Sequence, residues 1–280
     1  MLCRHKIVGG FGIIFRAIWT DGYIDGFNNN GWTRKPRINV CLKSLHNSKD
    51  INKDFLDEVK NQHNYGGISS IKIYGITKVP QGNDYMIVMQ YAKQGSLRQL
   101  LDSRFHELNW NCKINILYYM AQGLYAIHDA KLVHKDFHSG NIVNENLCFS
   151  YITDFGLCKP ISQNTNSKDL FGVLPYVAPE LLRASDNGNN IVYTQESDIY
   201  SFGIIMSEIF NGYPPYYNIP HDISLKLKIL EGQKPKIECE VPQLLLDLMN
   251  KCFDDEPKID HVLKNWLISL SNIELIFYTM

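Results

Sequence analysis

The sequence lacks any long uninterrupted apolar run, and it has no excess of charge of either sign. A helix that crosses a bilayer needs about 20 consecutive apolar residues, so membrane insertion is not expected. The 28 basic and 29 acidic residues leave a formal net charge of -1. This balance provides no basic surface for a polyanion, and a nucleic-acid partner is therefore not expected. The first ten residues also lack the apolar core of a secretory signal.

Closely spaced cysteine motifs, internal repeats and low-complexity tails are also missing from the sequence. The seven cysteines lie scattered along the chain and include no C-x-x-C pair. An odd, dispersed set suits a reducing compartment better than a disulfide framework, so we expect a cytoplasmic protein. The 280 residues, 45% of them hydrophobic and 20% charged, suffice for one large domain or two closely packed lobes.

The first part of the chain consists mainly of strand patterns. Segments rich in β-branched and aromatic residues occupy 13–19, 38–45 and 85–91. Residues 20–31 are rich in Gly, Asn and Asp, which predicts a turn or the tip of a long hairpin. One helix is predicted over 51–64, because apolar residues recur there every four positions along one face, with Leu56 beside them.

After about residue 95 the patterns become helical. Ser96 is the expected cap of the first helix. Helices are predicted over 96–103, 113–130, 196–210, 241–253 and 262–270. The segment 196–210 is apolar almost all round, which is typical of a helix buried in a core. Strands followed by helices predict an α+β fold with two lobes, and a cleft between lobes is a common place for ligands.

Three glycines stand close together in "VGGFG", at Gly9, Gly10 and Gly12. Because strand patterns lie on both sides of them, we expect a strand–turn–strand and not the strand–turn–helix of a dinucleotide fold. Glycines in such a hairpin allow backbone N–H groups to approach a phosphate closely. Taken alone, the pattern is a weak signal, and an ordinary tight hairpin is the better interpretation.

Two charged residues fall within apolar patterns of the first part. Lys43 ends the apolar segment "VCLK", and Glu58 lies beside the apolar face of the following helix. A buried lysine and a helix glutamate can pair, which fixes a positive charge able to contact a phosphate. Two unrelated surface charges are the simpler alternative.

The stretch "LVHKDFHSGN" gathers many polar groups in one loop. Asp136 and Asn141 stand five residues apart around Gly140, so a loop can turn both side chains toward one point. An aspartate can accept a hydroxyl proton, and an asparagine oxygen can bind Mg²⁺. Asp154 in "YITDFG" ends a short strand-like run and could add a second oxygen ligand. A plain turn would explain any one of these residues.

The order of these elements resembles that of the eukaryotic protein kinases over nearly the whole chain. Glycine hairpin, strand lysine, helix glutamate, H-x-D-x-x-x-x-N, D-F-G and then "APE" at 178–180 follow one another as in that family. "VMQYAKQGSLRQLL" and "ESDIYSFGIIMSEIF" resemble the tyrosine-kinase-like group most. The resemblance implies a single kinase domain over 1–280 with a bilobal α+β fold. Its small β-rich N-lobe with one main helix would span 1–91, and its larger helical C-lobe 92–280.

The resemblance also implies ATP and Mg²⁺ as cofactors, and it assigns a role to each matching residue. Gly9, Gly10 and Gly12 would cover the phosphates. Lys43 would hold the α- and β-phosphates, braced by Glu58. The adenine would be bound by Ile14, Cys41, Met89, Gln90, Tyr91, Ala92 and Val143.

The resemblance assigns the catalytic and metal-binding roles to motifs later in the chain. Asp136 would orient the incoming hydroxyl and accept its proton, while Asn141 and Asp154 would bind Mg²⁺. The internal struts that hold this loop would be His134, Phe155 and Asp198. The polar groups would converge because phosphoryl transfer needs positioning and charge neutralisation above all.

The sequence also departs from the kinase pattern. Ile7 replaces the first glycine of the loop, and Lys135 replaces the arginine before Asp136. A lysine only partly reproduces the bidentate grip of arginine on a phosphate, so control through loop phosphorylation is in doubt. Candidate acceptors for such control are Ser162, Thr165 and Ser167.

Further departures affect the acceptor specificity and the lower lobe. Val173 stands where serine/threonine kinases usually have threonine, and His138 stands where they usually have lysine. Neither matches the usual tyrosine-kinase pattern. Glu180 lacks its usual arginine partner in the C-terminal region, and an unpaired buried carboxylate would cost about 3–5 kcal/mol.

The leading hypothesis is therefore an active protein kinase that transfers the γ-phosphate of ATP to a protein substrate in intracellular signalling, with Ser/Thr favoured and Tyr left open. The alternative is a pseudokinase that acts as an ATP-binding or scaffolding module, which Ile7 and the shortened C-terminal region motivate. A small-molecule kinase is disfavoured by "APE" and by "NGYPPYYN". The oligomeric state is left open.

Overall fold

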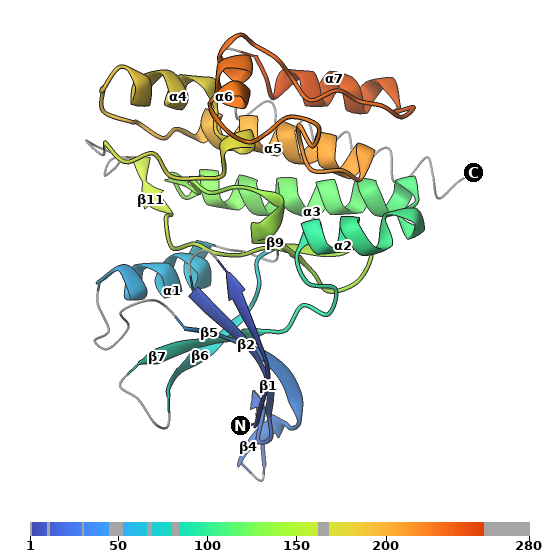
Figure 1. The fold of residues 1–280 in the computed structure, drawn as a ribbon. Coiled ribbons are helices and arrows are strands. Elements are labelled where there is room, and N and C mark those ends of the chain that lie inside the picture. The colour runs from blue at the N-terminus through green and yellow to red at the C-terminus, as the bar shows by residue number, and fades with distance from the viewer. Residues whose placement is uncertain are drawn as a thin grey trace. The chain divides into compact units, whose positions relative to one another are not determined.

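The computed structural model describes residues 2–9, 12–29, 31–44, 53–65, 69–79, 84–161 and 168–254. The chain divides into two compact units, which are described separately here (Figure 1). The first unit comprises Met1–Asn64 and Ile71–Lys93, and the second comprises Tyr65–Ser70 and Gln94–Met280. The predicted helix 262–270 lies outside the described residues.

The first unit contains a five-stranded sheet in which every neighbouring pair is antiparallel. In the order β1-β2-β5-β7-β6, the strands are Leu2–Gly9, Gly12–Trp19, Ile38–Ser44, Tyr85–Gln90 and Ile73–Lys78. The strands are rich in β-branched and aromatic residues, which suit a half-buried pleated surface. Their inner side chains form a small core of Ala17, Val40, Leu42 and Val88.

The glycine-rich segment joins the first two strands of this sheet. Gly9 at the end of β1 lies opposite Gly12 at the start of β2. The predicted strand–turn–strand is therefore confirmed, and a strand–turn–helix is excluded. Gly10 lies outside the described residues.

A second hairpin stands where the sequence predicts only a turn or a hairpin tip. Its strands β3, Tyr23–Asn28, and β4, Gly31–Lys35, pair antiparallel. Gly22, with φ 66°, leads into it, and a Cβ there would lie 1.6 Å from the carbonyl oxygen of Lys35. Only glycine therefore fits at this turn.

The helix α1, Lys53–Tyr65, agrees closely with the predicted helix over 51–64. Its buried face is more polar than expected: Glu58 and Gln62, one turn apart, are both buried, whereas Leu56 is exposed. The Nε2 of Gln62 donates to the carbonyl oxygen of Ile71 at 3.0 Å, whereas its Oε1 is buried without a hydrogen-bond partner within the described residues.

The second unit is helical, and its described helices surround one large apolar core. They are α2 Leu97–Arg104, α3 Trp110–Asp129, α4 Pro179–Asp186, α5 Gln195–Asn211, α6 Ile223–Leu230 and α7 Gln243–Lys251. Ser96 caps α2 as predicted and forms a reciprocal capping box with Gln99. Helix α5 is buried all round, which confirms that prediction too. Helices α4 and α6 were not predicted.

Short strands and 3-10 turns connect these helices. The strand pairs are β8 Leu132–Val133 with β11 Lys159–Pro160, and β9 Ile142–Asn144 with β10 Ser150–Ile152. The 3-10 turns are η1 Phe105–Glu107, η2 Ser139–Asn141 and η4 Leu174–Tyr176. A sheet-rich first unit and a helical second unit confirm the predicted α+β class.

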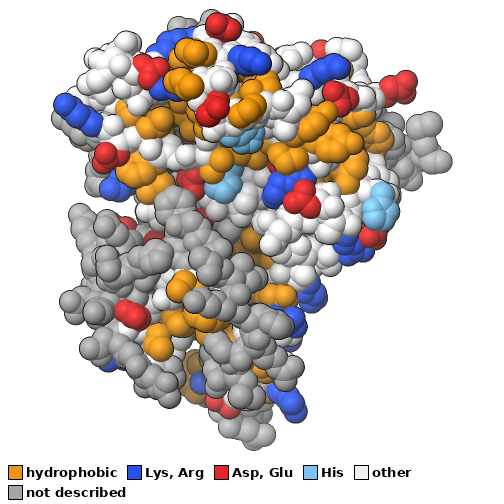
Figure 2. All heavy atoms as spheres, in the orientation of Figure 1, with side chains coloured by type: hydrophobic (Ala, Val, Ile, Leu, Met, Phe, Trp, Pro, Cys, Tyr) orange, Lys and Arg blue, Asp and Glu red, His pale blue; other side chains and the backbone are white. Residues whose placement is uncertain are grey.

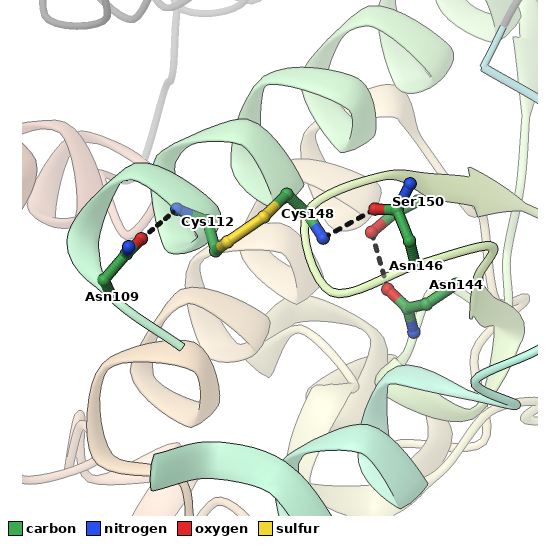
Figure 3. Close-up of a disulfide and its surroundings, with 6 residues drawn as sticks. All are labelled: Asn109, Cys112, Asn144, Asn146, Cys148 and Ser150. Atoms are coloured by element: carbon green, nitrogen blue, oxygen red, sulfur yellow. Dashed lines mark hydrogen bonds between the residues drawn. A yellow bond between two sulfur atoms is a disulfide. The ribbon is translucent and has the colours of Figure 1, made fainter. Parts of the chain in front are cut away.

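One disulfide is present, although the dispersed cysteines favoured a reducing compartment over a disulfide framework. Cys112 in the first turn of α3 is bonded to Cys148 in the turn between β9 and β10 (Figure 3). The two residues are 36 positions apart, and only the packing of that turn against α3 brings them together. Spacing along the sequence gave no sign of this pair. Asn109 caps the same helix end by accepting from the N–H of Cys112.

Hydrophobic side chains lie among charged ones on the visible surface of the second unit (Figure 2). Its exposed apolar side chains include Tyr213, Tyr217, Ile223 and Leu227. Within the described part of the chain, no helix combines the length and the apolar character that a membrane span requires.

Candidate active site

In the first unit, Lys43 and Glu58 form a buried ion pair. Lys43 Nζ lies 2.8 Å from Glu58 Oε1, and the two side chains are only 5% and 4% exposed. Strand β5 holds the lysine between Ile14 and Ile87 on the neighbouring strands. The structure thus contains the ion pair that the sequence predicts, and α1 fixes the direction of the ammonium group.

The residues expected to bind adenine lie mainly on the central strands of the same sheet. Cys41 pairs with Met89, and Met89 is buried. Burial raises the pKa of the Cys41 thiol to about 12, so the thiol stays protonated at neutral pH. The N–H of Gln90 donates to the carbonyl oxygen of Lys72 at 2.8 Å. Tyr91 follows β7 directly, and Ala92 comes next.

Val143 belongs to the second unit, unlike the other residues expected at the adenine. It lies in the middle of β9 and bridges to Ser96, the cap of α2. The structure therefore anchors it next to the loop that contains Asn141.

Asp198 holds the loop after β8 through hydrogen bonds to its backbone. It lies in the first turn of α5 and is buried. Its two carboxylate oxygens accept from the backbone N–H groups of His134, at 2.8 Å, and Lys135, at 3.0 Å. His128 Nε2 lies 2.9 Å from the same carboxylate. This is the geometry expected of a strut, and His128 is a further member that sequence reasoning missed.

His134 joins this loop to the segment around Asp154. Its ring is fully buried, accepts from the N–H of Asp136 at 3.4 Å, and lies 3.3 Å from the carbonyl oxygen of Thr153. The ring also contacts Phe155 at a centroid distance of 5.8 Å. These contacts place the backbone of the two loops at a fixed separation.

Asp136 has two differently placed carboxylate oxygens. Oδ2 accepts from Asn141 Nδ2 at 2.9 Å, whereas Oδ1 is buried without a hydrogen-bond partner within the described residues. Burial alone raises the pKa of Asp136, but interactions with His138, His134 and Asn141 outweigh it and lower the pKa below its usual value. The carboxylate is therefore ionised at neutral pH, with Oδ2 held by Asn141 and Oδ1 without a hydrogen-bond partner in the described chain. An unpaired buried oxygen is rare in proteins, and a catalytic role is one of the explanations for it.

Asn141 and Asp154 stand at the open end of the β9–β10 hairpin. Asn141 precedes β9, and its carbonyl oxygen accepts from the N–H of Thr153 at 2.9 Å. Asp154 follows directly and has φ 64°, a left-handed conformation that costs a non-glycine residue about 1–3 kcal/mol. Such strain persists where the surrounding structure enforces it, and it clusters at active sites.

The donor set at this end of the hairpin suits a hard cation. The amide oxygen of Asn141 and the carboxylate of Asp154 are ligand types that Mg²⁺ prefers. Within the described residues, no group of three or more His, Cys, Asp and Glu side chains is arranged to hold a metal. A Mg²⁺ ion here would therefore take its remaining ligands from phosphate oxygens and water, as it usually does.

A buried network around Glu208 was missed by sequence reasoning. The carboxylate of Glu208 accepts from Tyr176 at 2.7 Å, from Ser139 at 3.1 Å and from Arg98 at 2.5 Å. It thereby links α5 to η4, η2 and α2. Burial and the adjacent carboxylate raise the pKa of Tyr176 well above its usual value, so Tyr176 acts as a donor. The only sequence signal for this network was a glutamate inside an apolar helix. That signal did not identify the hydrogen-bond partners of Glu208.

The residues that depart from the kinase pattern lie in different structural environments. Ile7 lies in β1 opposite Ile14, and Val173 is exposed before η4. Lys135 lies over the ring of Tyr193, 5.3 Å from its centroid. Glu180 is exposed in the first turn of α4, so the full cost of an unpaired buried carboxylate does not arise, although partial desolvation raises the pKa of its carboxyl. Three candidate phosphoacceptors lie outside the described residues, namely Ser162, Thr165 and Ser167.

Comparison with known proteins gives a consistent result. A family model described as protein tyrosine and serine/threonine kinase matches residues 5–264. Ankyrin repeat and protein kinase domain-containing protein 1 of Mus musculus is 29% identical over 271 residues, which cover 89% of this chain and 33% of that protein. Putative serine/threonine-protein kinase/receptor R831 of Acanthamoeba polyphaga mimivirus is 28% identical and covers 95% of this chain, but 16% of its own length.

A third relative is receptor-interacting serine/threonine-protein kinase 4 of Homo sapiens, which is 27% identical over 78% of this chain and 27% of its own length. The chain thus spans at most about a third of the length of these three proteins. The match over 5–264, together with the sheet-rich first unit and helical second unit, confirms the predicted bilobal kinase fold. The chain therefore belongs to the protein tyrosine and serine/threonine kinase family.

Proposed function

We propose that this chain is an ATP- and Mg²⁺-dependent protein kinase that transfers the γ-phosphoryl group to a protein hydroxyl. The observation that carries the proposal is the environment of Asp136. Asn141 holds Oδ2 at 2.9 Å, and Oδ1 is buried without a hydrogen-bond partner in the described chain. An ionised carboxylate with one free oxygen is suited to accept the proton of an incoming hydroxyl group.

The Lys43–Glu58 pair supports a second role. A buried, glutamate-braced ammonium group supplies a fixed positive charge for phosphate oxygens, and holding it in advance avoids the cost of reorganisation during the reaction. The glycine-rich turn at Gly9, Gly10 and Gly12 would bring backbone N–H groups to the phosphates. Ile14, Cys41, Met89, Gln90, Ala92 and Val143 would bind the adenine.

Asn141 and Asp154 would hold Mg²⁺, which neutralises charge on the phosphates when bound. The chain's own contribution is to fix these two oxygens. Hairpin β9–β10 fixes Asn141, while Asp154 is fixed by its left-handed backbone beside the carbonyl oxygen that His134 contacts.

We further propose that serine or threonine, and not tyrosine, is the favoured acceptor. Two of the relatives named above are called serine/threonine-protein kinases. The sequence of α2 and α5 favours the tyrosine-kinase-like group within the family. The first unit would be the N-lobe and the second the C-lobe of one domain, acting on protein substrates in signalling.

The second candidate function is that of a pseudokinase that binds ATP or acts as a scaffold. Ile7, which occupies a strand position in β1 instead of the first glycine of the loop, favours this alternative. It would bind nucleotide and transfer nothing.

Radiolabelled ATP separates the two candidates. The chain is incubated with γ-labelled ATP, Mg²⁺ and mixed protein acceptors, and the labelled amino acids are identified after hydrolysis. The proposal predicts label on serine or threonine. Label on tyrosine would contradict the proposed acceptor. No label, with ATP still raising the melting temperature, would favour the pseudokinase.

A further inference from the structure

The imidazole of His138 lies between two groups of its own loop. Its Nδ1 accepts a hydrogen bond from the N–H of Gly140 at 3.0 Å, and its Nε2 lies 3.4 Å from Asp136 Oδ2. His138 thus caps the 3-10 turn η2 with one nitrogen and faces the candidate base with the other.

These two contacts select one tautomer of the ring. The Gly140 N–H can donate only to a nitrogen that has a lone pair, so Nδ1 carries no proton. In a neutral imidazole the proton then resides on Nε2. The N–H group of His138 then lies on the nitrogen that is 3.4 Å from Asp136 Oδ2, within ion-pair distance of the carboxylate.

The space that the imidazole of His138 occupies depends on the absence of a side chain at Gly140. A Cβ on Gly140 would lie 2.6 Å from His138 Cε1 and 2.8 Å from Nδ1, so a side chain at 140 would displace the imidazole. The ring of Tyr176 lies at a centroid distance of 5.8 Å. The side chain of His138 remains 17% exposed. Gly140 thus leaves room for the imidazole, and part of the His138 side chain is exposed to solvent.

These contacts affect the orientation of the Asp136 carboxylate. Asn141 Nδ2 and His138 Nε2 both face Oδ2, and neither faces Oδ1. Two donors on one oxygen oppose rotation of the carboxylate more strongly than a single donor does. Oδ1 is then kept as the free acceptor.

We propose that His138 is a positioning residue for phosphoryl transfer, which holds Asp136 Oδ2 through its Nε2–H so that Oδ1 receives the hydroxyl proton. In that step the substrate oxygen bonds to the γ-phosphorus, the bond to ADP breaks, and the O–H proton passes to Oδ1. The inference rests on the proposed function, because it assigns a role to a neighbour of the proposed base.

Capping of η2 alone would also explain where the His138 ring lies. Two substitutions separate this capping role from the proposed positioning of Asp136. In His138→Asn the amide oxygen can still accept from the Gly140 N–H, but the shorter side chain cannot reach Asp136. In His138→Lys the ammonium group can donate to Oδ2, but it has no lone pair for Gly140. His106→Asn is the matched control, since His106 is 79% exposed in η1.

The test measures kcat, KM for ATP and melting temperature for these variants. We expect His138→Asn to keep the melting temperature and KM while kcat falls about tenfold, which corresponds to about 1.4 kcal/mol. His138→Lys should regain most of kcat at a lower melting temperature, and His106→Asn should match the wild type. Nitrogen NMR of the wild type should show the Nε2–H tautomer of His138.

Wild-type kcat in His138→Asn, or an Nδ1–H tautomer, would overturn the inference while leaving the proposed function intact. A wild type that transfers no phosphate to any acceptor would instead overturn the proposed function, and this inference with it.

Discussion

Arg98 Nη1 lies 2.5 Å from Glu208 Oε1, and this contact joins α2 to the buried helix α5. Glu208 is fully buried, whereas the arginine side chain is 19% exposed. The same guanidinium donates to the carbonyl oxygen of Gly212 at 2.6 Å. Because Glu208 also accepts from Ser139 and Tyr176, one buried carboxylate determines where the loop next to Asp136 packs.

Arg98→Met should destabilise the protein by about 3–5 kcal/mol, because it leaves the charge of Glu208 buried without its cation. Urea unfolding measures the change. Combining Arg98→Met with Glu208→Gln should recover part of the loss, since no charge then remains buried. Arg104→Met serves as the control, because its ion pair with Glu107 is on the surface, where such pairs contribute little. Equal stability of Arg98→Met and wild type would contradict this account of the network.

Lys43→Met should reduce phosphate transfer by about 10²–10³-fold, because it removes a preorganised charge from the phosphates. Glu58→Gln should have a similar but smaller effect, since the lysine stays and loses its brace. Lys60→Met, an exposed change on the same helix as Glu58, is the control. Steady-state transfer from labelled ATP provides the comparison, and unchanged turnover in Lys43→Met would show that the ion pair is structural only.

Asp154→Asn and Asn141→Ala should both raise the Mg²⁺ concentration needed for half-maximal transfer, because each removes an oxygen ligand of a hard cation. Titration of Mg²⁺ at fixed ATP gives this value. Asp247→Asn, on the exposed side of α7, should leave the titration unchanged. A wild-type Mg²⁺ requirement in both site variants would remove these residues from the metal site.

Reduction of the Cys112–Cys148 bond should lower the free energy of unfolding by about 3–4 kcal/mol, as expected from the loop entropy for a separation of 36 residues. Cys112→Ser should have the same effect, whereas Cys239→Ser, at an exposed free cysteine, should not. Thiol counting in denaturant should find two fewer thiols before reduction than after it. An equal count would show that the bond does not form.

Local patterns were sufficient to predict much of the fold. The cap at Ser96, the all-round apolar character of α5 and the strand at Lys43 are all encoded within a few neighbouring residues. The spacing of Asp136 and Asn141 likewise predicted a loop that turns both side chains to one point, and their side chains are in hydrogen-bond contact.

The features that were missed depend on contacts between distant segments. Glu208 gives no sequence signal for its partner Arg98, which lies 110 residues away. The partnership of His128 with Asp198 is likewise visible only in three dimensions. The hairpin β3–β4 was predicted only as a turn or the tip of a long hairpin, because its strands lack the alternation of a half-buried strand.

The most direct test of the central claim is phosphate transfer by Asp136→Asn, measured together with ATP affinity. The account predicts that transfer is abolished while ATP binds as tightly as in the wild type, because the change removes the proton acceptor and no nucleotide contact. Transfer at the wild-type rate by Asp136→Asn would contradict it.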